Sequence, residues 1–251
     1  MLKRERLEKI LEIVKKEKVA SVSELAEKVK VSEMTIRRDL DELSASNRLL
    51  RVHGGARIIN DVVPIEIDYQ QKREIHIPEK KDVAKSAAEL IKDGETIYVG
   101  PGTTLELMVA NLKQHKLRII TNSLPVFNAA RANVNNFDLI LIGGIYRRKS
   151  GAFVGAIANR DIQSMAYDRA FVGVNGIMGT SLMTANMDEG LTQAQALNRA
   201  KKRYIVTDMH KFDRSDFYEF YRLDNVDKLI TNQELDKEKW TKYSRYTDIS
   251  H

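Results

Sequence analysis

The segment Val31–Arg57, VSEMTIRRDLDELSASNRLLRVHGGAR, decides how the first part of the chain folds. Ser32 is suited to cap a helix, and Glu33 places a carboxylate near the positive N-terminal end of that helix. Apolar side chains at close to helical spacing then predict one buried stripe, made of Met34, Ile36, Leu40 and Leu43. A polar break, a strand-like segment at 49–52 and a tight turn at 53–55 follow. The pattern is typical of a helix followed by a two-stranded wing.

The front of this predicted helix carries the first indication of function. Thr35, Arg37 and Arg38 lie off the apolar stripe, and we expect them to point outward. Residues of these types at the front of a helix reach base edges and phosphates in the DNA major groove. We therefore predict a DNA-binding surface made of Ser32, Thr35, Arg37, Arg38, Arg51, His53 and Arg57. The alternatives are a solvated basic helix face and a wing that docks on another protein.

Two further helices are predicted upstream of this segment. The first runs from about Lys3 to Glu17, with an apolar face made of Leu7, Ile10, Leu11, Ile13 and Val14. Ser23 is expected to cap the second, after a short connection at 20–22. The order helix, helix, turn, helix and wing is that of a winged helix-turn-helix. Phosphate contacts are also expected from three cations near the start of the chain, namely Lys3, Arg4 and Arg6.

The composition excludes several classes of protein and of site. With 251 residues, 43% of them hydrophobic, the chain is long enough for one or two domains with a buried core. It has no run of about 18 apolar residues that would span a membrane. Its charged start does not resemble a signal peptide, so we expect a cytoplasmic protein. It has no cysteine, and its five histidines lack ligand spacing, so we expect neither disulfides nor a metal site.

From Glu95 onward, short apolar segments alternate with helical segments, which predicts an α/β sheet. The predicted strands are Thr96–Val99, Leu117–Ile120, Leu139–Ile142, Arg169–Val174, Arg203–Thr207 and Lys228–Ile230. We therefore divide the chain into a winged-helix domain (1–57), a linker (58–74) and an α/β effector domain (75–251).

Small and hydroxylated residues follow several of these strands, at the edge where open α/β sheets bind ligands. The loop Gly100–Thr104, GPGTT, allows close approach to its backbone, and its threonines and the following helix offer donors that suit a phosphate. Together with the loops TNS (121–123) and Gly143–Gly144, it predicts a site for a small phosphorylated metabolite. Available cations are Arg147, Arg148, Lys149 and Lys211. The alternatives are glycines that only form tight turns and a solvated cation cluster.

The motif VSEMTIRRDLDEL followed by RVHGGA resembles the signature of the DeoR family of bacterial transcriptional regulators, in which it forms the DNA-binding head. Residues 75–235 resemble the effector domain of that family, which is similar in fold to ribose-5-phosphate isomerase and the coenzyme A transferases. With GPGTT, ITNSLPV, LIGGIYR, GAFVG and MDEGLTQ, the chain is most similar to the branch that represses lactose phosphotransferase system operons in Gram-positive bacteria. It departs from the family at Asn47, usually Gly, at Gly100-Pro101, usually Asp-Ser, and at Gln193, often Lys.

This resemblance implies a homo-oligomeric repressor (a dimer or tetramer) of a lactose or galactose utilisation operon. A sugar phosphate, tagatose 6-phosphate, would release it from double-stranded operator DNA, and no cofactor is expected. The resemblance assigns sugar-phosphate contacts to Glu189, Lys211, Asn122 and the GPGTT threonines. The predicted effector-binding residues are therefore Gly100, Gly102, Thr103, Thr104, Asn122, Gly143, Gly144, Arg147, Glu189 and Lys211. Two alternatives stay open: an activator, and a phosphosugar isomerase-like enzyme with an added DNA-binding head.

Overall fold

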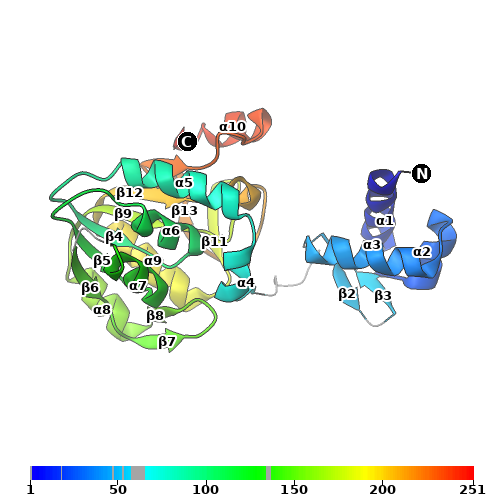
Figure 1. Cartoon of the computed structure of the whole chain (residues 1–251), viewed down its shortest axis with the longest axis horizontal. Helices are drawn as coiled ribbons and strands as arrows, with labels where there is room; N and C mark the ends of the chain where they lie inside the picture. Colours follow the sequence, from blue (N-terminus) through cyan, green and yellow to red (C-terminus); the bar gives the residue numbers. More distant parts are fainter. Residues whose placement is uncertain (1, 18, 47, 53, 58–65, 134–136) are drawn as a thin grey trace. The chain divides into compact units, whose positions relative to one another are not determined.

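The computed structural model describes residues 2–17, 19–46, 48–52, 54–57, 66–133 and 137–251 (Figure 1). The chain divides into two compact units, Met1–Pro64 and Ile65–His251, and each is described by itself. The predictions made for Asn47 and His53, and for the first part of the linker, fall outside the described residues.

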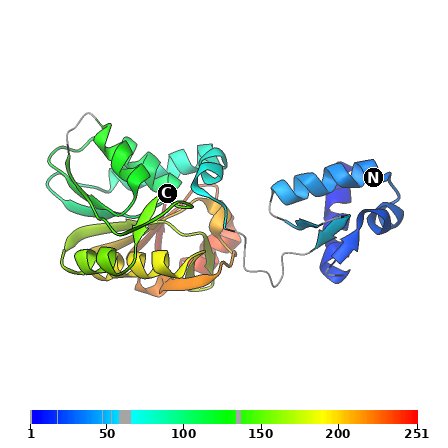
Figure 2. The same cartoon turned by 90° about the horizontal axis from the view of Figure 1, so that it is seen from below.

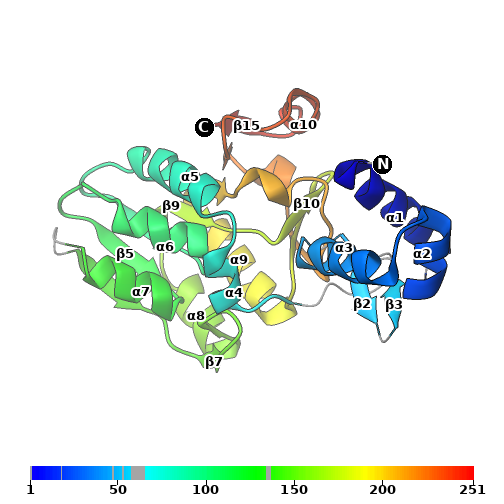
Figure 3. The ribbon, with the colours of Figure 1, turned by 45° about the vertical axis from the view of Figure 1, so that its right-hand side comes forward.

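The N-terminal unit has the predicted order of elements (Figure 3). Its elements are α1 (Lys3–Glu17), β1 (Val19–Ser21), α2 (Val22–Val29), α3 (Glu33–Ala45), β2 (Leu50–Val52) and β3 (Gly55–Arg57). The wing contains a third strand that the sequence analysis did not predict, because β1 pairs antiparallel with β3. Because β1 ends at Ser21, α2 begins at Val22, and its N-cap is Ser21 rather than Ser23. Ser21 forms a capping box with Glu24.

The core of this unit confirms most of the predicted apolar stripe on α3. Ile36, Leu40 and Leu43 are buried against α1 and α2. Met34 was assigned to the stripe wrongly, since its side chain is 63% exposed. It lies two positions before Ile36, which on a helix places it on the opposite face.

A glycine is required where the wing meets β1. A Cβ atom at Gly55 would lie 2.3 Å from the carbonyl oxygen of Ala20, so no larger residue fits at this pairing. The preceding Gly54 has φ +76°, the left-handed conformation that lets the chain turn between β2 and β3.

The C-terminal unit is built on a seven-stranded sheet in the order β15-β14-β12-β9-β4-β5-β6. Every neighbouring pair in this sheet is parallel. The strands are β4 (Thr96–Val99), β5 (Arg118–Thr121), β6 (Asp138–Leu141), β9 (Tyr167–Val172), β12 (Ala200–Val206), β14 (Lys228–Ile230) and β15 (Asp248–Ser250). All six predicted strands are present, and β15 is additional.

Helices cover both faces of this sheet (Figure 2). One face carries α5 (Ile77–Glu89), α6 (Thr103–Ala110) and α7 (Leu124–Arg131), and the other carries α8 (Ala156–Gln163) and α9 (Met187–Asn198). Alternate residues of a strand point to opposite faces. Accordingly, Ile97 and Val99 pack with α5 and α6, whereas Tyr98 packs in the cluster of α8 and α9.

The remaining elements lie around the sheet. They are α4 (Tyr69–Glu74), β7 (Ile145–Arg147), β8 (Ala152–Val154), β10 (Gly176–Met178), β11 (Ser181–Thr184), two short 3-10 helices η1 (Met209–Lys211) and η2 (Leu223–Asn225), β13 (Tyr218–Arg222) and α10 (Lys237–Tyr243). The C-terminal stretch is anchored on the unit, because β15 extends the sheet and Tyr243 is fully buried. None of the helices within the described ranges is long and apolar enough to cross a membrane.

Candidate functional site

The front of α3 is exposed, as a DNA-reading helix requires. Ser32 caps it by accepting a hydrogen bond from the Thr35 backbone N–H at 3.3 Å. Arg37 and Arg38 are exposed, and Arg37 has one ion pair, 3.3 Å to Glu33 one turn earlier on the surface. Such exposed pairs are weak, so neither arginine is held inward. The arginine side chains of this helix therefore remain accessible to a phosphate or a base edge.

The wing is tied to the same helix by Arg51. Its guanidinium contacts Asp41 of α3 at 3.1 Å and donates to the Gly55 carbonyl at 3.3 Å. One cation therefore orients the β2–β3 hairpin relative to α3. His53 and the side chain of Arg57, both predicted to contact DNA, fall outside what the structure describes.

Arg6 has a different role from the one that the sequence predicts. Its Nε and a terminal nitrogen bind the carboxylate of Asp39 at 2.6 and 3.0 Å, and Asp39 is only 3% exposed. The hydrogen bond with Asp39 raises the pKa of Arg6. This bidentate pair joins α1 to the inner face of α3, so Arg6 holds the winged helix together and is not a free phosphate contact.

A pocket opens at the carboxyl edge of the parallel sheet, over three adjacent strands. Residues that follow β4, β9 and β12 line it, including Pro101, Gly173 and Thr207. Between β4 and β9 the chain order reverses: β5 and β6 extend the sheet on one side, and β12 and β14 on the other. Ligands bind at such switch points in open α/β sheets. The pocket contains about 730 Å³ of space, part of it open to solvent.

The GPGTT loop forms one wall of the pocket. Gly102 precedes α6 with φ +148°, and Thr103 and Thr104 begin the helix with 8% exposure each. The backbone N–H groups of this first turn have no partner within α6, which makes them donors for an anion. Gly100 does not line the pocket; its N–H donates to the Phe171 carbonyl at 2.9 Å and holds the loop against β9.

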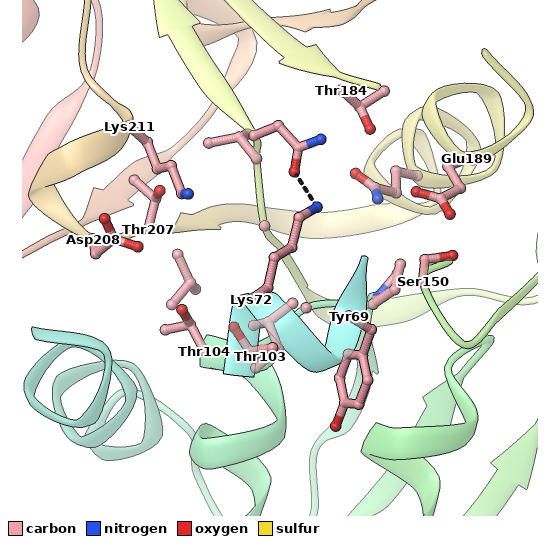
Figure 4. A pocket seen from close by; sticks show the side chains of 18 of the residues that line it. Tyr69, Lys72, Thr103, Thr104, Ser150, Thr184, Glu189, Thr207, Asp208 and Lys211 are labelled. Carbon is pink, nitrogen blue, oxygen red and sulfur yellow. Dashed lines mark hydrogen bonds between the residues drawn. The ribbon is translucent and has the colours of Figure 1, made fainter. Parts of the chain in front are cut away.

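Four lysines line the pocket. Lys149, one of the predicted cations, is largely exposed and pairs with Glu66, and the other three, two of which were not predicted, converge on the pocket. Lys72 extends from α4 into the pocket and donates to Asn175 Oδ1 at 2.9 Å (Figure 4). Lys80 of α5 donates to the carbonyl of Lys72, and Lys211 comes from η1. Burial lowers the pKa of Lys72, Lys80 and Lys211, that of Lys80 to about 8. Repulsion from neighbouring ammonium groups adds to the effect at Lys80 and Lys211, and repulsion from Arg147 adds to it at Lys72. A bound anion would relieve that repulsion.

A signal for Lys80 was present in the sequence. Counted along the helix, Lys80 shares a face with Val83, Ala84 and Ala87, which are buried. A lysine within a buried stripe is rare unless it is paired or functional. Lys72 had no such signal, because the stretch that contains it was assigned to the linker.

Polar groups suited to hydroxyls line the rest of the pocket. Glu189 lies in the first turn of α9, where its backbone N–H donates to the side chain of the N-cap residue Asn186. Asp208 follows β12. Ser150 Oγ and Gln193 Oε1 are buried and have no hydrogen-bond partner within the described part of the chain. Buried polar atoms are nearly always paired, so such atoms in a pocket wall are suited to a ligand. Glu189 and Asp208 supply acceptors for ligand hydroxyl groups.

The structure places the other predicted effector residues outside the pocket lining. Asn122 is buried between Tyr98, whose hydroxyl donates to it at 2.7 Å, and the carbonyl of Phe153, to which it donates at 2.8 Å. Gly143 and Gly144 form the turn from β6 to β7. Arg147 sits behind the pocket wall, bound to Glu66 and, at 3.0 Å, to Glu189. Its role in this geometry is to orient Glu189.

Comparison with known proteins shows that both units match domain models of the same protein family. Residues 6–62 match the DeoR-like helix-turn-helix domain, and residues 75–233 match the DeoR C-terminal sensor domain. The chain is 42% identical to the lactose phosphotransferase system repressor of Lactococcus lactis subsp. lactis, over 99% of this chain and 98% of that protein. It is 40% identical to the protein of that name from Streptococcus mutans, over 99% of both.

Solved structures with a similar arrangement include ribose 5-phosphate isomerase A of Methanocaldococcus jannaschii. The TM-score is 0.39 at 20% identity, and 53% of each chain is covered.

Proposed function

The chain belongs to the DeoR family of transcriptional regulators, and we propose that it is a repressor of a lactose phosphotransferase system operon that a sugar phosphate releases from DNA. The observation that carries this proposal is the pocket in which the buried Lys80, the half-buried Lys72 and Lys211, and the start of α6 converge. Such a pocket is suited to a phosphate group, and it lies in the same chain as a winged helix with an exposed front.

The N-terminal unit would bind the operator through α3. Thr35, Arg37 and Arg38 at its exposed front are the residues that we propose to contact bases and phosphates, with Ser32 at the cap and Arg51 in the wing. An operator with two symmetric half-sites needs a symmetric protein, so we propose that the repressor acts as a homo-oligomer. A protein that binds the chromosome of a bacterium also works in the cytoplasm.

The sensor unit would hold the phosphate between the α6 N-terminus and the ammonium groups of Lys72, Lys80 and Lys211. The sugar hydroxyls would then face Ser150 and Gln193. We propose tagatose 6-phosphate as the effector, because the chain is similar over nearly its whole length to lactose phosphotransferase system repressors.

The helix α4 is suited to couple the pocket to the DNA-binding unit. It follows the segment that joins the two units, and its Lys72 ends inside the pocket. In the structure Lys72 is bound to Asn175; a phosphate that takes over this ammonium group would shift α4. Relief of repression by tenfold requires that the effector bind the released form about 1.4 kcal/mol more tightly than the DNA-bound form.

A binding assay with two ligands tests the proposal. The DNA upstream of the chain's own operon is labelled, and its complex with the protein is followed by fluorescence anisotropy as tagatose 6-phosphate or unphosphorylated tagatose is added. We expect release by the phosphate ester alone, and a rise in the melting temperature of the free protein with the same ligand. No DNA binding at low salt, or equal release by both sugars, would contradict the proposal.

The same samples test the enzyme alternative. We propose that the pocket senses its ligand without turnover. Tagatose 6-phosphate incubated with the protein at stoichiometric concentration should therefore be recovered unchanged, as measured by NMR. Conversion to an isomeric sugar phosphate that is lost with Glu189→Gln would favour an enzyme.

A further inference from the structure

The structure brings together two histidines and a glutamate that lie far apart in the sequence. His76 immediately precedes α5, Glu79 is in the first turn of that helix, and His210 is in η1. The ligand-capable atoms of these three side chains all lie within 4.8 Å of one another. The two imidazole rings stack with centroids 3.7 Å apart, and His210 Nε2 is 3.4 Å from Glu79 Oε1.

Two features of this cluster are not explained by packing. His76 has φ +53° and ψ +40°, a left-handed conformation that is unfavourable for a non-glycine residue. It occupies the helix N-cap without making the side-chain cap hydrogen bond that favours residues there. Glu79 Oε2 is buried and has no hydrogen-bond partner among the described residues. A strained ligand-type residue beside an unpaired carboxylate oxygen is typical of a binding site.

The elements that carry the cluster are held together by a neighbouring side chain. Asn232, which follows β14, donates to the Glu79 carbonyl at 2.8 Å and accepts from the Met209 N–H at 3.0 Å. Asp208 accepts from the His210 N–H at 3.0 Å and so fixes the start of η1. The three ligand-type side chains therefore project from elements whose relative position is set, as a metal site requires.

We propose that His76, Glu79 and His210 form a binding site for a divalent transition-metal ion, with Zn²⁺ as the best match. Two imidazoles and one carboxylate are a ligand set that Zn²⁺ accepts, with a fourth position left for water. The side chains of His210 and Glu79 are 34% and 27% exposed, so an ion can reach the site from solvent. The ligand atoms are close enough that small side-chain rotations bring them around one ion.

The electrostatic surroundings favour the ligating forms of these groups. Burial, and then the neighbouring His210, lower the pKa of His76, which is therefore neutral near pH 7. The backbone N–H of Glu79 and the side chain of His210 lower the pKa of Glu79, which keeps its carboxylate charged. Asp208 adds a negative charge nearby. Lys80 and Lys211, the cations next to the ligands in sequence, line the effector pocket, and Lys211 also lowers the pKa of His76.

Such an ion would join α5 to η1 directly beside the effector pocket. Lys80 follows Glu79, and Lys211 follows His210, so the ion would fix the two segments that carry two of the pocket lysines. The proposal goes beyond the proposed function and does not depend on it, because metal binding is measured without DNA and without a sugar phosphate.

The experiment is a metal titration of the untagged full-length protein after treatment with a chelator. Isothermal titration with Zn²⁺ should give one site per chain, and Co²⁺ should give the visible absorption of a tetrahedral ion. Because the chain has no cysteine, that spectrum should lack a thiolate charge-transfer band. Mg²⁺, which prefers oxygen ligands in octahedral geometry, should bind much more weakly.

Three variants and one control assign the ligands. His76→Asn keeps a residue that tolerates the left-handed backbone, Glu79→Gln keeps the shape, and His210→Gln removes the second imidazole. Each should weaken Zn²⁺ binding at least tenfold, whereas His115→Gln, on an exposed loop, should have no effect. Melting curves without metal show whether each variant is folded.

The proposal is overturned if the wild type binds no Zn²⁺ stoichiometrically, or if the variants bind it as well as the wild type. It is also overturned if His115→Gln causes the same loss. Should a histidine variant not fold, Glu79→Gln and the Co²⁺ spectrum of the wild type decide.

Discussion

Lys80 donates a hydrogen bond from its Nζ to the backbone carbonyl of Lys72, and both side chains line the same pocket. This contact joins α5, which is part of the buried sensor core, to α4, which follows the connection to the DNA-binding unit. A ligand that attracts the Lys80 ammonium group therefore acts on the contact between the two helices.

The substitution Lys80→Met should abolish the response to the effector without loss of fold. The methionine fills similar space but removes a buried ammonium group whose pKa is lowered to about 8. Because the folded protein disfavours that charge, its removal should leave the melting temperature unchanged or higher. The measurement is release of operator DNA by the sugar phosphate, with Lys85→Met on the exposed side of α5 as the matched control. Full induction of the Lys80→Met protein would contradict this role.

Affinity for a sugar phosphate should fall as pH rises above neutrality. The charged form of Lys80 binds the anion, and with a pKa of about 8 this form is mostly present at pH 7 and mostly lost at pH 9. The dissociation constant should therefore rise by about tenfold between pH 7 and pH 9, or about 1.4 kcal/mol. Isothermal titration across this range measures it. The Lys80→Met protein provides the comparison, because its weaker affinity should vary less with pH.

Alanine substitutions of two arginines of the N-terminal unit should separate operator binding from stability. Arg38→Ala, on the exposed front of α3, should weaken operator binding and leave stability unchanged. Arg6→Ala should lower the free energy of unfolding of this unit by about 3 kcal/mol, because it leaves the buried Asp39 carboxylate without its partner. Hydrogen exchange of the α1 amides reports stability, and Arg4→Ala is the exposed control. The double variant Arg6→Met with Asp39→Leu has no unpaired buried carboxylate, so it should be more stable than Arg6→Ala. Equal or lower stability of the double variant would contradict this explanation.

The β2–β3 wing and the helix α3 should make different kinds of contact with DNA. Arg51→Ala should weaken binding to all DNA sequences and reduce the dependence of log K on log salt by about one unit, as loss of a phosphate contact does. Thr35→Ala should instead change the preference among operator variants. Anisotropy titrations at several salt concentrations and with single-base variants measure both. An Arg51 variant that changes base preference at an unaltered salt slope would reverse the assignment.

The sequence by itself determined the elements that depend on neighbours along the chain. The spacing of Ile36, Leu40 and Leu43 predicts α3 because a helix repeats every 3.6 residues, and Ser32 caps it through a bond to a residue three positions on. The alternation of apolar segments and glycine-containing loops likewise predicts the parallel sheet and the GPGTT wall of the pocket. The error at Ser23 is corrected by the pairing of β1 with β3, whereas the error at Met34 follows from helix geometry alone.

Only the tertiary structure decided which charged residues serve the pocket, the core or neither. Lys72 and Asn175 are 103 positions apart, and Arg6 and Asp39 are 33 apart, so no local spacing indicates either contact. The same holds for His76 and His210. A charged side chain costs free energy when it is buried, and whether a partner or a ligand offsets that cost depends on which strands are neighbours in the sheet. That order of strands, and not the local pattern, separates Lys72, Lys80 and Lys211 in the pocket from Arg147 behind its wall.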